Sequence, residues 1–203
     1  KSKFFFKRKI SNVVFMGMGE PLLNYKNVIK AIKKIKLKSG LNFSAKKITI
    51  STSGIPKLIK QIAQEDLKCN LAVSLHSAIQ KTREKIMPFS EKFPIEDLID
   101  SLKYWYRVTK KKILYEYIIF DGINDNIEHV KALVKMCKII PCKVNFIEYN
   151  PTGDITFRQC KIEKLKLYQK YLASEGIVNT YRISRGRDIN AACGQLINLN
   201  KVS

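Results

Sequence analysis

A cysteine near the end of the sequence is the first candidate for chemistry. Cys193 lies in the stretch DINAACGQL, between small alanines and a glycine, and Arg182, Arg185 and Arg187 come shortly before it. The thiolate is the nucleophilic form of cysteine, and neighbouring cations favour it. We therefore take Cys193 as a candidate reactive thiol.

A second candidate is the turn MGMGEPLLN, which follows the first apolar run of the sequence. Gly17 and Gly19 allow the backbone to turn sharply and to approach a ligand closely. Glu20 adds a carboxylate, and Pro21 stiffens the exit toward a helix. Free carbonyls and a carboxylate suit a ligand ammonium group, although the same residues also form ordinary strand-to-helix turns.

Polar side chains also follow the other apolar runs. The segment STSG, residues 51–54, offers hydroxyls that either bond a sugar or cap the next helix. Ser74 and His76 follow the third run, where a lone histidine is a site residue or a structural donor. The loop DGIND, 121–125, is typical of a turn and helix cap. Asn150, held extended by the next proline, either contacts a base or ribose edge or simply starts a loop.

Six short apolar runs must position these residues. The predicted strands are 12–17, 46–51, 70–76, 113–120, 143–150 and 179–184. Apolar residues at helical spacing lie between them, and this alternation, at roughly 30 to 40 residues per unit, predicts a parallel sheet. The first run has the apolar pattern of a buried strand. We therefore expect an α/β fold of one domain, residues 1–203, with a ligand site at the carboxyl ends of the strands.

The composition excludes several classes of protein. Hydrophobic residues make up 45% of the 203 residues, which allows a core and argues against disorder. No apolar run approaches the roughly 18 to 20 residues of a membrane span, and the first residues lack the apolar region of a signal peptide. We expect a globular protein of the cytoplasm, or of an organellar matrix, with no membrane partner.

The charge and the cysteines point to a reducing compartment and a polyanionic partner. The net charge is +21, from 38 basic and 17 acidic residues, which favours RNA or DNA. The lysine bias of an AT-rich genome explains part of the same excess. Five scattered cysteines indicate reduced thiols rather than a disulfide scaffold. No pair has CxxC spacing, so the sequence contains no metal or iron–sulfur ligand set of its own.

Taken together, the motifs resemble those of one family. In order and approximate spacing, GMGEPLLN, STSG, SLH, GIND, NP and DINAACGQL are similar to motifs of the radical S-adenosylmethionine (SAM) enzymes that methylate carbon 2 of an adenine in 23S ribosomal RNA. Members of that family also act on some tRNAs. The similarity extends from Asn12 to Leu196, and GMGEP together with AACGQL is its most specific part.

The resemblance implies roles for individual residues. Gly19 and Glu20 would hold the methionine part of SAM, and Cys193 would be the methyl carrier. The small residues beside Cys193 would leave its sulfur accessible, because the sulfur must accept a methyl group and then reach an RNA base. The cofactor-binding residues that the resemblance implies are Gly19, Glu20, Ser51, Ser74, Leu75, His76 and Asn150.

The implied chemistry needs a cysteine because carbon 2 of adenine is not nucleophilic. In the family, one SAM methylates the carrier thiolate by displacement. A second SAM is cleaved reductively at a [4Fe-4S] cluster, and the radical so formed takes a hydrogen from the S-methyl group, whose carbon then adds to the base. A second cysteine releases the RNA by forming a disulfide with the carrier. The family also implies an electron donor such as flavodoxin or ferredoxin, and a monomer.

The chain departs from the family pattern in one respect. The CxxxCxxC loop that holds the cluster is absent from the sequence, and the resolving cysteine, the first barrel strand and a small N-terminal RNA-binding domain have no counterpart. We therefore expect the C-terminal portion of a longer enzyme. Its fold would be an incomplete (β/α)6 barrel, open on one side, and alone it would neither bind the cluster nor turn over.

Three other interpretations compete with this one. A sister family that methylates carbon 8 of the same adenine shares the AACGQL carrier, although the GEPLLN run favours the carbon-2 branch. A non-catalytic basic RNA-binding module would explain the missing cluster cysteines, but it has no need of the GMGEP turn or of Cys193. A small-molecule α/β enzyme would use neither the charge nor this cysteine.

Overall fold

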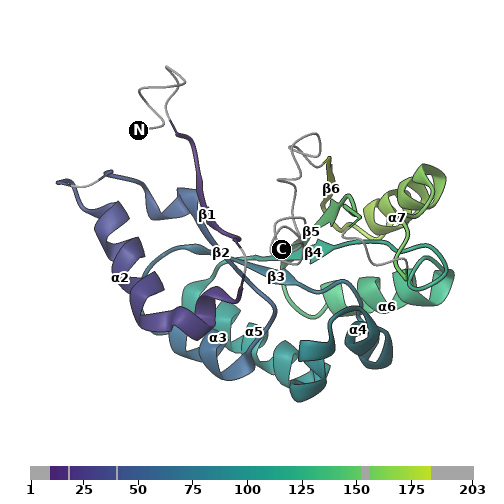
Figure 1. The fold of residues 1–203 in the computed structure, drawn as a ribbon, viewed down its shortest axis with the longest axis horizontal. Coiled ribbons are helices and arrows are strands. Elements are labelled where there is room, and N and C mark those ends of the chain that lie inside the picture. Colours follow the sequence, from purple (N-terminus) through teal and green to yellow (C-terminus); the bar gives the residue numbers. More distant parts are fainter. Residues whose placement is uncertain (1–9, 18, 40, 152–155, 184–203) are drawn as a thin grey trace, which may run out of the picture.

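Six parallel strands form one sheet whose spatial order follows the sequence (Figure 1). The computed structural model describes residues 10–17, 19–39, 41–151 and 156–183. The strands are β1 (Val13–Phe15), β2 (Ile48–Thr52), β3 (Asn70–Ser74), β4 (Ile113–Tyr117), β5 (Cys142–Ile147) and β6 (Asn179–Arg182). Every neighbouring pair is parallel, which confirms the predicted α/β class.

Helices connect the strands and cover one face of the sheet (Figure 1). The elements are η1 (Pro21–Asn24), α2 (Tyr25–Lys36), η2 (Ala45–Lys47), α3 (Pro56–Ala63), α4 (Gln80–Ile86), η3 (Pro88–Lys92), α5 (Ile95–Thr109), α6 (Ile127–Cys137) and α7 (Ile162–Ser174), where η marks a 3-10 helix. Consecutive strand order combined with right-handed crossovers brings every connecting helix to the same side. The sheet curves away from the helices, which gives it the shape of a partial barrel.

The core lies between the sheet and the helices. Tyr115 and Tyr117 of β4 are fully buried. The ring of Tyr117 packs edge-on against Phe146 of β5, which in turn contacts Tyr168 of α7. Because successive strand residues point to opposite faces, Glu116 between the two tyrosines points to the concave face.

Two expectations about the elements were wrong. The first strand was expected to be buried, but Val14 in β1 is 57% exposed, because β1 lies at an edge of the described sheet and has β2 as its neighbour on one side. The segment between β3 and β4 was expected to contain one helix, with its apolar stripe at residues 95–102, which is α5. That segment also contains α4 and η3, which were not predicted because their short, charged sequences carry no clear apolar stripe.

The four cysteines in the described part of the chain are free thiols. Cys69, Cys137 and Cys160 are buried, and Cys142 is half-buried. Among the described residues, no helix is long and apolar enough to cross a bilayer.

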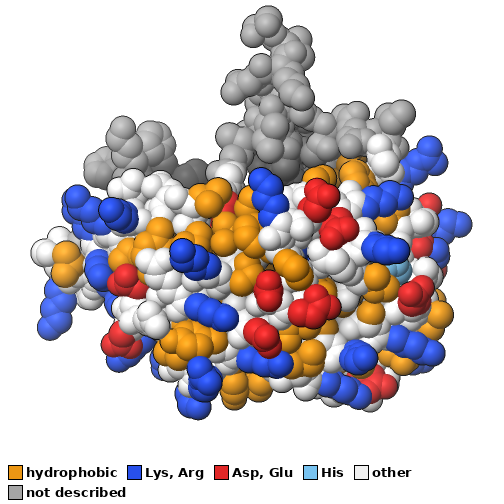
Figure 2. All heavy atoms as spheres, turned by 90° about the horizontal axis from the view of Figure 1, so that it is seen from below, with side chains coloured by type: hydrophobic (Ala, Val, Ile, Leu, Met, Phe, Trp, Pro, Cys, Tyr) orange, Lys and Arg blue, Asp and Glu red, His pale blue; other side chains and the backbone are white. Residues whose placement is uncertain are grey.

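The helix-bearing side of the molecule carries charges of both signs. Figure 2, which views the molecule from below, shows lysine and arginine side chains scattered among acidic ones, with apolar patches between them. The basic residues therefore do not gather into one patch on the face that this view shows.

We predict that Gly54 tolerates a side chain worse than Gly122 does. Both have a positive φ, +98° and +68°, so Gly122→Ala should cost about 1 kcal/mol of unfolding free energy. At Gly54 an added Cβ would also lie 3.0 Å from Leu98 Cδ1 and 3.3 Å from Arg83 Nη2, so Gly54→Ala should cost about 2–3 kcal/mol. Urea unfolding of both variants measures the difference, and equal losses would contradict the prediction.

Candidate functional site

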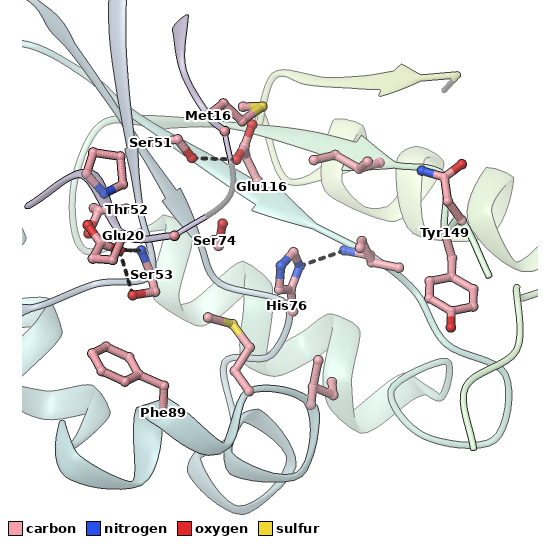
Figure 3. Close-up of a pocket in the computed structure, with 18 of the residues that line it drawn as sticks. Met16, Glu20, Ser51, Thr52, Ser53, Ser74, His76, Phe89, Glu116 and Tyr149 are labelled. Atoms are coloured by element: carbon pink, nitrogen blue, oxygen red, sulfur yellow. Dashed lines mark hydrogen bonds between the residues drawn. The ribbon is translucent and has the colours of Figure 1, made fainter. Parts of the chain in front are cut away.

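A cavity of about 570 Å³ lies at the carboxyl ends of the strands (Figure 3). Its volume is that of a typical small-molecule site. Six of the residues predicted to bind the cofactor line it: Gly19, Glu20, Ser51, Ser74, His76 and Asn150. The structure does not bring the Leu75 side chain to the cavity, because that side chain is fully buried in the core. Cys193 lies outside the described residues.

The carboxylate of Glu20 ties the turn after β1 to the turn after β2. Its Oε2 accepts hydrogen bonds from the Ser53 backbone N–H at 2.6 Å and from the Ser53 hydroxyl at 2.7 Å. Its Oε1 accepts from the Leu22 N–H at 2.9 Å, at the start of η1. Two carboxylate oxygens offer about four acceptor positions, so three bonds fix the group and leave it able to accept one more.

A buried arginine lies behind the same turn. Arg83 of α4 has no exposed surface, and its Nη2 donates to the Ser53 carbonyl at 2.6 Å. Its Nε and Nη1 have no hydrogen-bond partner among the described residues. Burial lowers the pKa of the guanidinium to about 10, so it stays charged at neutral pH. Ser53 therefore connects the Arg83 guanidinium to the Glu20 carboxylate.

A second carboxylate lies on the floor of the cavity. Glu116 of β4 is 3% exposed, and its Oε2 accepts a hydrogen bond from the Ser51 hydroxyl at 3.0 Å (Figure 3). Burial raises the pKa of Glu116, while the Ser51 hydrogen bond and the charge of Arg182 oppose that shift. Ser51, one of the predicted cofactor residues, is thereby held in one orientation.

His76 offers the cavity a neutral hydrogen-bond donor. Its backbone has a φ of 54°, which is uncommon outside glycine. Its Nδ1 accepts from the Ile118 N–H at 3.2 Å, so the ring proton of the neutral form is on Nε2. Burial, with a smaller contribution from the Arg83 charge, lowers the pKa of His76 to about 4. At neutral pH the residue is therefore an uncharged donor.

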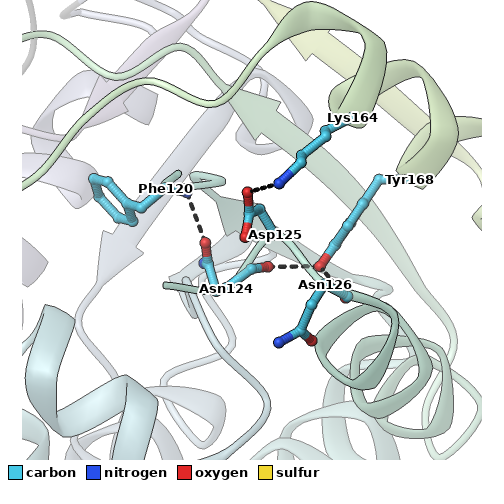
Figure 4. A network of polar contacts seen from close by, with 6 residues as sticks. All are labelled: Phe120, Asn124, Asp125, Asn126, Lys164 and Tyr168. Carbon is cyan, nitrogen blue, oxygen red and sulfur yellow. Dashed lines mark hydrogen bonds and ion pairs between the residues drawn. The ribbon is translucent and has the colours of Figure 1, made fainter. Parts of the chain in front are cut away.

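Residues of the DGIND loop make polar contacts with Phe120, Lys164 and Tyr168 (Figure 4). Asn124 is fully buried; its amide donates to the His76 carbonyl at 2.6 Å and its side-chain oxygen accepts from the Phe120 N–H at 2.6 Å. Asp125 forms an ion pair with Lys164 of α7. Burial alone would raise the pKa of Asp125, but the bond from Lys164 lowers it. The loop is thus a structural support, as its turn-like sequence indicates.

One wall of the cavity is apolar. It is formed by Ile86, Met87, Phe89, Ile118 and Phe120. The ring of Phe120 packs on Tyr149 and Phe157, with centroids 5.1 and 4.9 Å away, and the next residue after Tyr149 is Asn150, which is 3% exposed. An apolar wall facing a few convergent polar groups suits a ligand with a flat apolar part and a polar part.

Sequence reasoning missed two residues of this site. Glu116 is the only charged residue in the apolar run ILYEYIIF, and a lone carboxylate inside a buried strand is a signal that could have identified it. Arg83 gave no such signal, because the sequence QKTREKI has the composition of an exposed helix.

Comparison with known proteins gives long and close matches. Over 198 residues the chain is 57% identical to a probable dual-specificity RNA methyltransferase RlmN of Flavobacterium psychrophilum. The aligned residues are 98% of this chain and 57% of that protein. It is 43% identical over 196 residues to the dual-specificity RNA methyltransferase RlmN of Nautilia profundicola, covering 97% of this chain and 55% of that protein. The chain therefore spans little more than half the length of these curated relatives. No protein-family model matches it.

Solved structures agree with the sequence matches. A radical SAM methyltransferase from Sphaerobacter thermophilus superposes with a TM-score of 0.89 at 36% identity, over 93% of this chain and 55% of that one. A domain of a pyruvate-formate lyase-activating enzyme from Bacteroides vulgatus shares the fold at a TM-score of 0.65 and 15% identity. With this fold, this cavity and 57% identity across nearly its whole length, the chain is similar to a large part of the RlmN dual-specificity RNA methyltransferases, and its fold matches that of a radical SAM methyltransferase.

Proposed function

We propose that this chain forms the SAM-binding part of an enzyme that methylates carbon 2 of adenine in 23S ribosomal RNA and in tRNA. The observation that carries the proposal is the convergence of six residues on one cavity. They come from separate motifs between Gly19 and Asn150, and the resemblance assigns each of them to cofactor binding. The dual-specificity RNA methyltransferases that match the chain support an RNA substrate.

The residues of the cavity fit SAM. The apolar wall at Phe89 and Ile118 would pack against the adenine, and the Nε2–H of His76 would donate a hydrogen bond to the cofactor. The remaining acceptor capacity of Glu20 suits the ammonium group of the methionine part. When bound, SAM supplies the methyl group and, with a reduced cluster, the means of abstracting a hydrogen atom from an unreactive carbon.

The described residues do not fit an iron–sulfur cluster. Among them, no three His, Cys, Asp or Glu side chains lie together as metal ligands. We propose that the cluster ligands belong to the part of the relatives' length that this chain does not span. An electron donor such as flavodoxin or ferredoxin, a cytoplasmic location and a monomeric state are part of the same proposal.

The direct test is methylation by the full-length protein. With SAM, a reductant and either a 23S rRNA fragment or tRNA, mass spectrometry of the digested nucleosides should detect 2-methyladenosine. Detection of 8-methyladenosine instead would assign the protein to the sister reaction. Binding of RNA without any methylated nucleoside, from a protein with its cluster in place, would favour the RNA-binding module.

Replacing the proposed methyl carrier should abolish the reaction. We expect Cys193→Ala in the full-length protein to yield no methylated adenosine, because alanine cannot accept a methyl group, while binding of S-adenosylhomocysteine persists. Cys160→Ala is the matched control, since Cys160 is 5% exposed and burial raises the pKa of its thiol to about 11. Methylation by the Cys193 variant would rule out the carrier role.

RNA affinity should depend strongly on salt. With a net charge of +21, phosphate contacts should release counterions, so binding of tRNA should weaken at least about tenfold between 50 and 200 mM salt. Fluorescence anisotropy at several salt concentrations gives the slope. A flat slope would mean that the lysines do not contact phosphate.

A further inference from the structure

One carboxylate in the cavity is only half satisfied. Glu116 is the only buried acidic residue in the described part of the chain, with 3% exposure. Its Oε2 accepts the Ser51 hydroxyl, but its Oε1 has no hydrogen-bond partner among the described residues. The resemblance gave this residue no role, and the proposed function does not use it.

A structural role explains this arrangement poorly. A buried polar group that lacks a partner costs free energy, and a charged one costs more. The nearest cation identified for Glu116 is Arg182 of β6, but that guanidinium contacts the Met16 sulfur at 3.5 Å. Packing alone would favour an apolar side chain at this position. A carboxylate at position 116 is less costly if a bound ligand donates a hydrogen bond to its Oε1.

The neighbours of Glu116 indicate what kind of group donates. Ser51, Ser74 and Glu116 come from the adjacent strands β2, β3 and β4, and all three line the cavity. In the register of the sheet, Ser74 is the partner of Glu116. Two hydroxyls and one carboxylate match a diol, because each of its hydroxyl groups both donates and accepts.

A ligand ammonium group fits less well at this position. The Arg182 charge lies close enough to oppose the pKa shift of Glu116, so a second cation would meet repulsion there. Glu20, on the turn after β1, keeps acceptor capacity for such a cation. The two carboxylates of the cavity would thus contact different parts of one ligand.

We propose that Glu116 is a cofactor-binding residue whose Oε1 accepts a hydrogen bond from a ribose hydroxyl of the SAM nucleoside. The proposal rests on the proposed function, because it takes SAM as the occupant of the cavity. In this role Glu116 orients the nucleoside and makes the site selective for a sugar that carries the hydroxyl bonded to its Oε1.

The test compares ligands that differ by one hydroxyl. Binding of S-adenosylhomocysteine, its 2′-deoxy form and its 3′-deoxy form to the full-length protein with its cluster is measured by calorimetry. We expect Glu116→Gln to weaken binding of the parent compound roughly tenfold or more, as for a hydrogen bond to a charged group. One deoxy form should bind the wild type more weakly than the parent, and Glu116→Gln should lose that preference.

Controls separate binding from folding. Glutamine can still accept the Ser51 hydrogen bond, so without ligand the melting temperature of Glu116→Gln should equal or exceed that of the wild type. A lower melting temperature with unchanged ligand preference would overturn the proposal and indicate a structural role. Glu163→Gln, an exposed change on α7, should alter neither property. If Glu116→Gln does not fold, Glu116→Asp, which keeps the charge but withdraws the oxygen, should show the same loss of preference.

Two further outcomes are decisive. The effect of Glu116→Gln should persist with 5′-methylthioadenosine, which keeps the ribose and lacks the ammonium group; its disappearance would assign the donor to the ammonium and overturn the proposal. A wild-type protein that does not bind S-adenosylhomocysteine at all would overturn the proposed function, and the ribose assignment with it. If the wild type binds and Glu116→Gln keeps the same preference, only the ribose assignment fails.

Discussion

The cavity depends on a short chain of contacts from Arg83 through Ser53 to Glu20. The guanidinium donates to the Ser53 carbonyl, and the amide and hydroxyl of the same residue donate to the carboxylate. A charge without exposed surface is costly unless an opposite charge or hydrogen bonds compensate it. Here Ser53 supplies hydrogen bonds to both groups, because its carbonyl accepts from Arg83 and its amide and hydroxyl donate to Glu20. Because the contacts join α4 to the turns after β1 and β2, three separate segments take up one fixed geometry at the cavity.

The two faces of the sheet have different chemistry because strand side chains alternate. On β4, Tyr115 and Tyr117 are fully buried, and Tyr117 packs on Phe146 in the core, while Glu116 between them lines the cavity. On β2 and β3, Ser51 and Ser74 line the same cavity. The helix side thus contains the apolar core, and the concave side carries the polar residues that line the cavity. A change on one face need not disturb the other.

Much of the fold could be predicted from the sequence, and less of the site. The six strands could be predicted because short apolar runs alternate with segments whose apolar residues have helical spacing. The place of the cavity could be predicted because parallel strands end at one edge of the sheet. Residues such as Glu20 and His76 were found because they lie beside glycine turns and strand ends. The position of Arg83 beside the cavity was not predicted. Its burial depends on where α4 packs against the turn after β2, and the local sequence does not indicate that packing. The exposure of Val14 was not expected from the apolar pattern of its run, because that pattern does not show how many neighbouring strands β1 has.

The incomplete hydrogen bonding of the cavity bears on which interpretation of the chain is preferable. A protein that only attracted RNA by charge would need exposed lysines, and evolution of its interior would favour apolar residues at buried positions. In this chain Glu116 keeps an oxygen without a partner among the described residues, and Arg83 keeps two such nitrogens. His76 keeps a strained backbone that Asn124 stabilises. Strain and unsatisfied polar groups persist where they serve binding or catalysis, and Glu116, Arg83 and His76 lie in or directly behind one cavity. The arrangement therefore favours a cofactor site over a purely electrostatic RNA-binding surface.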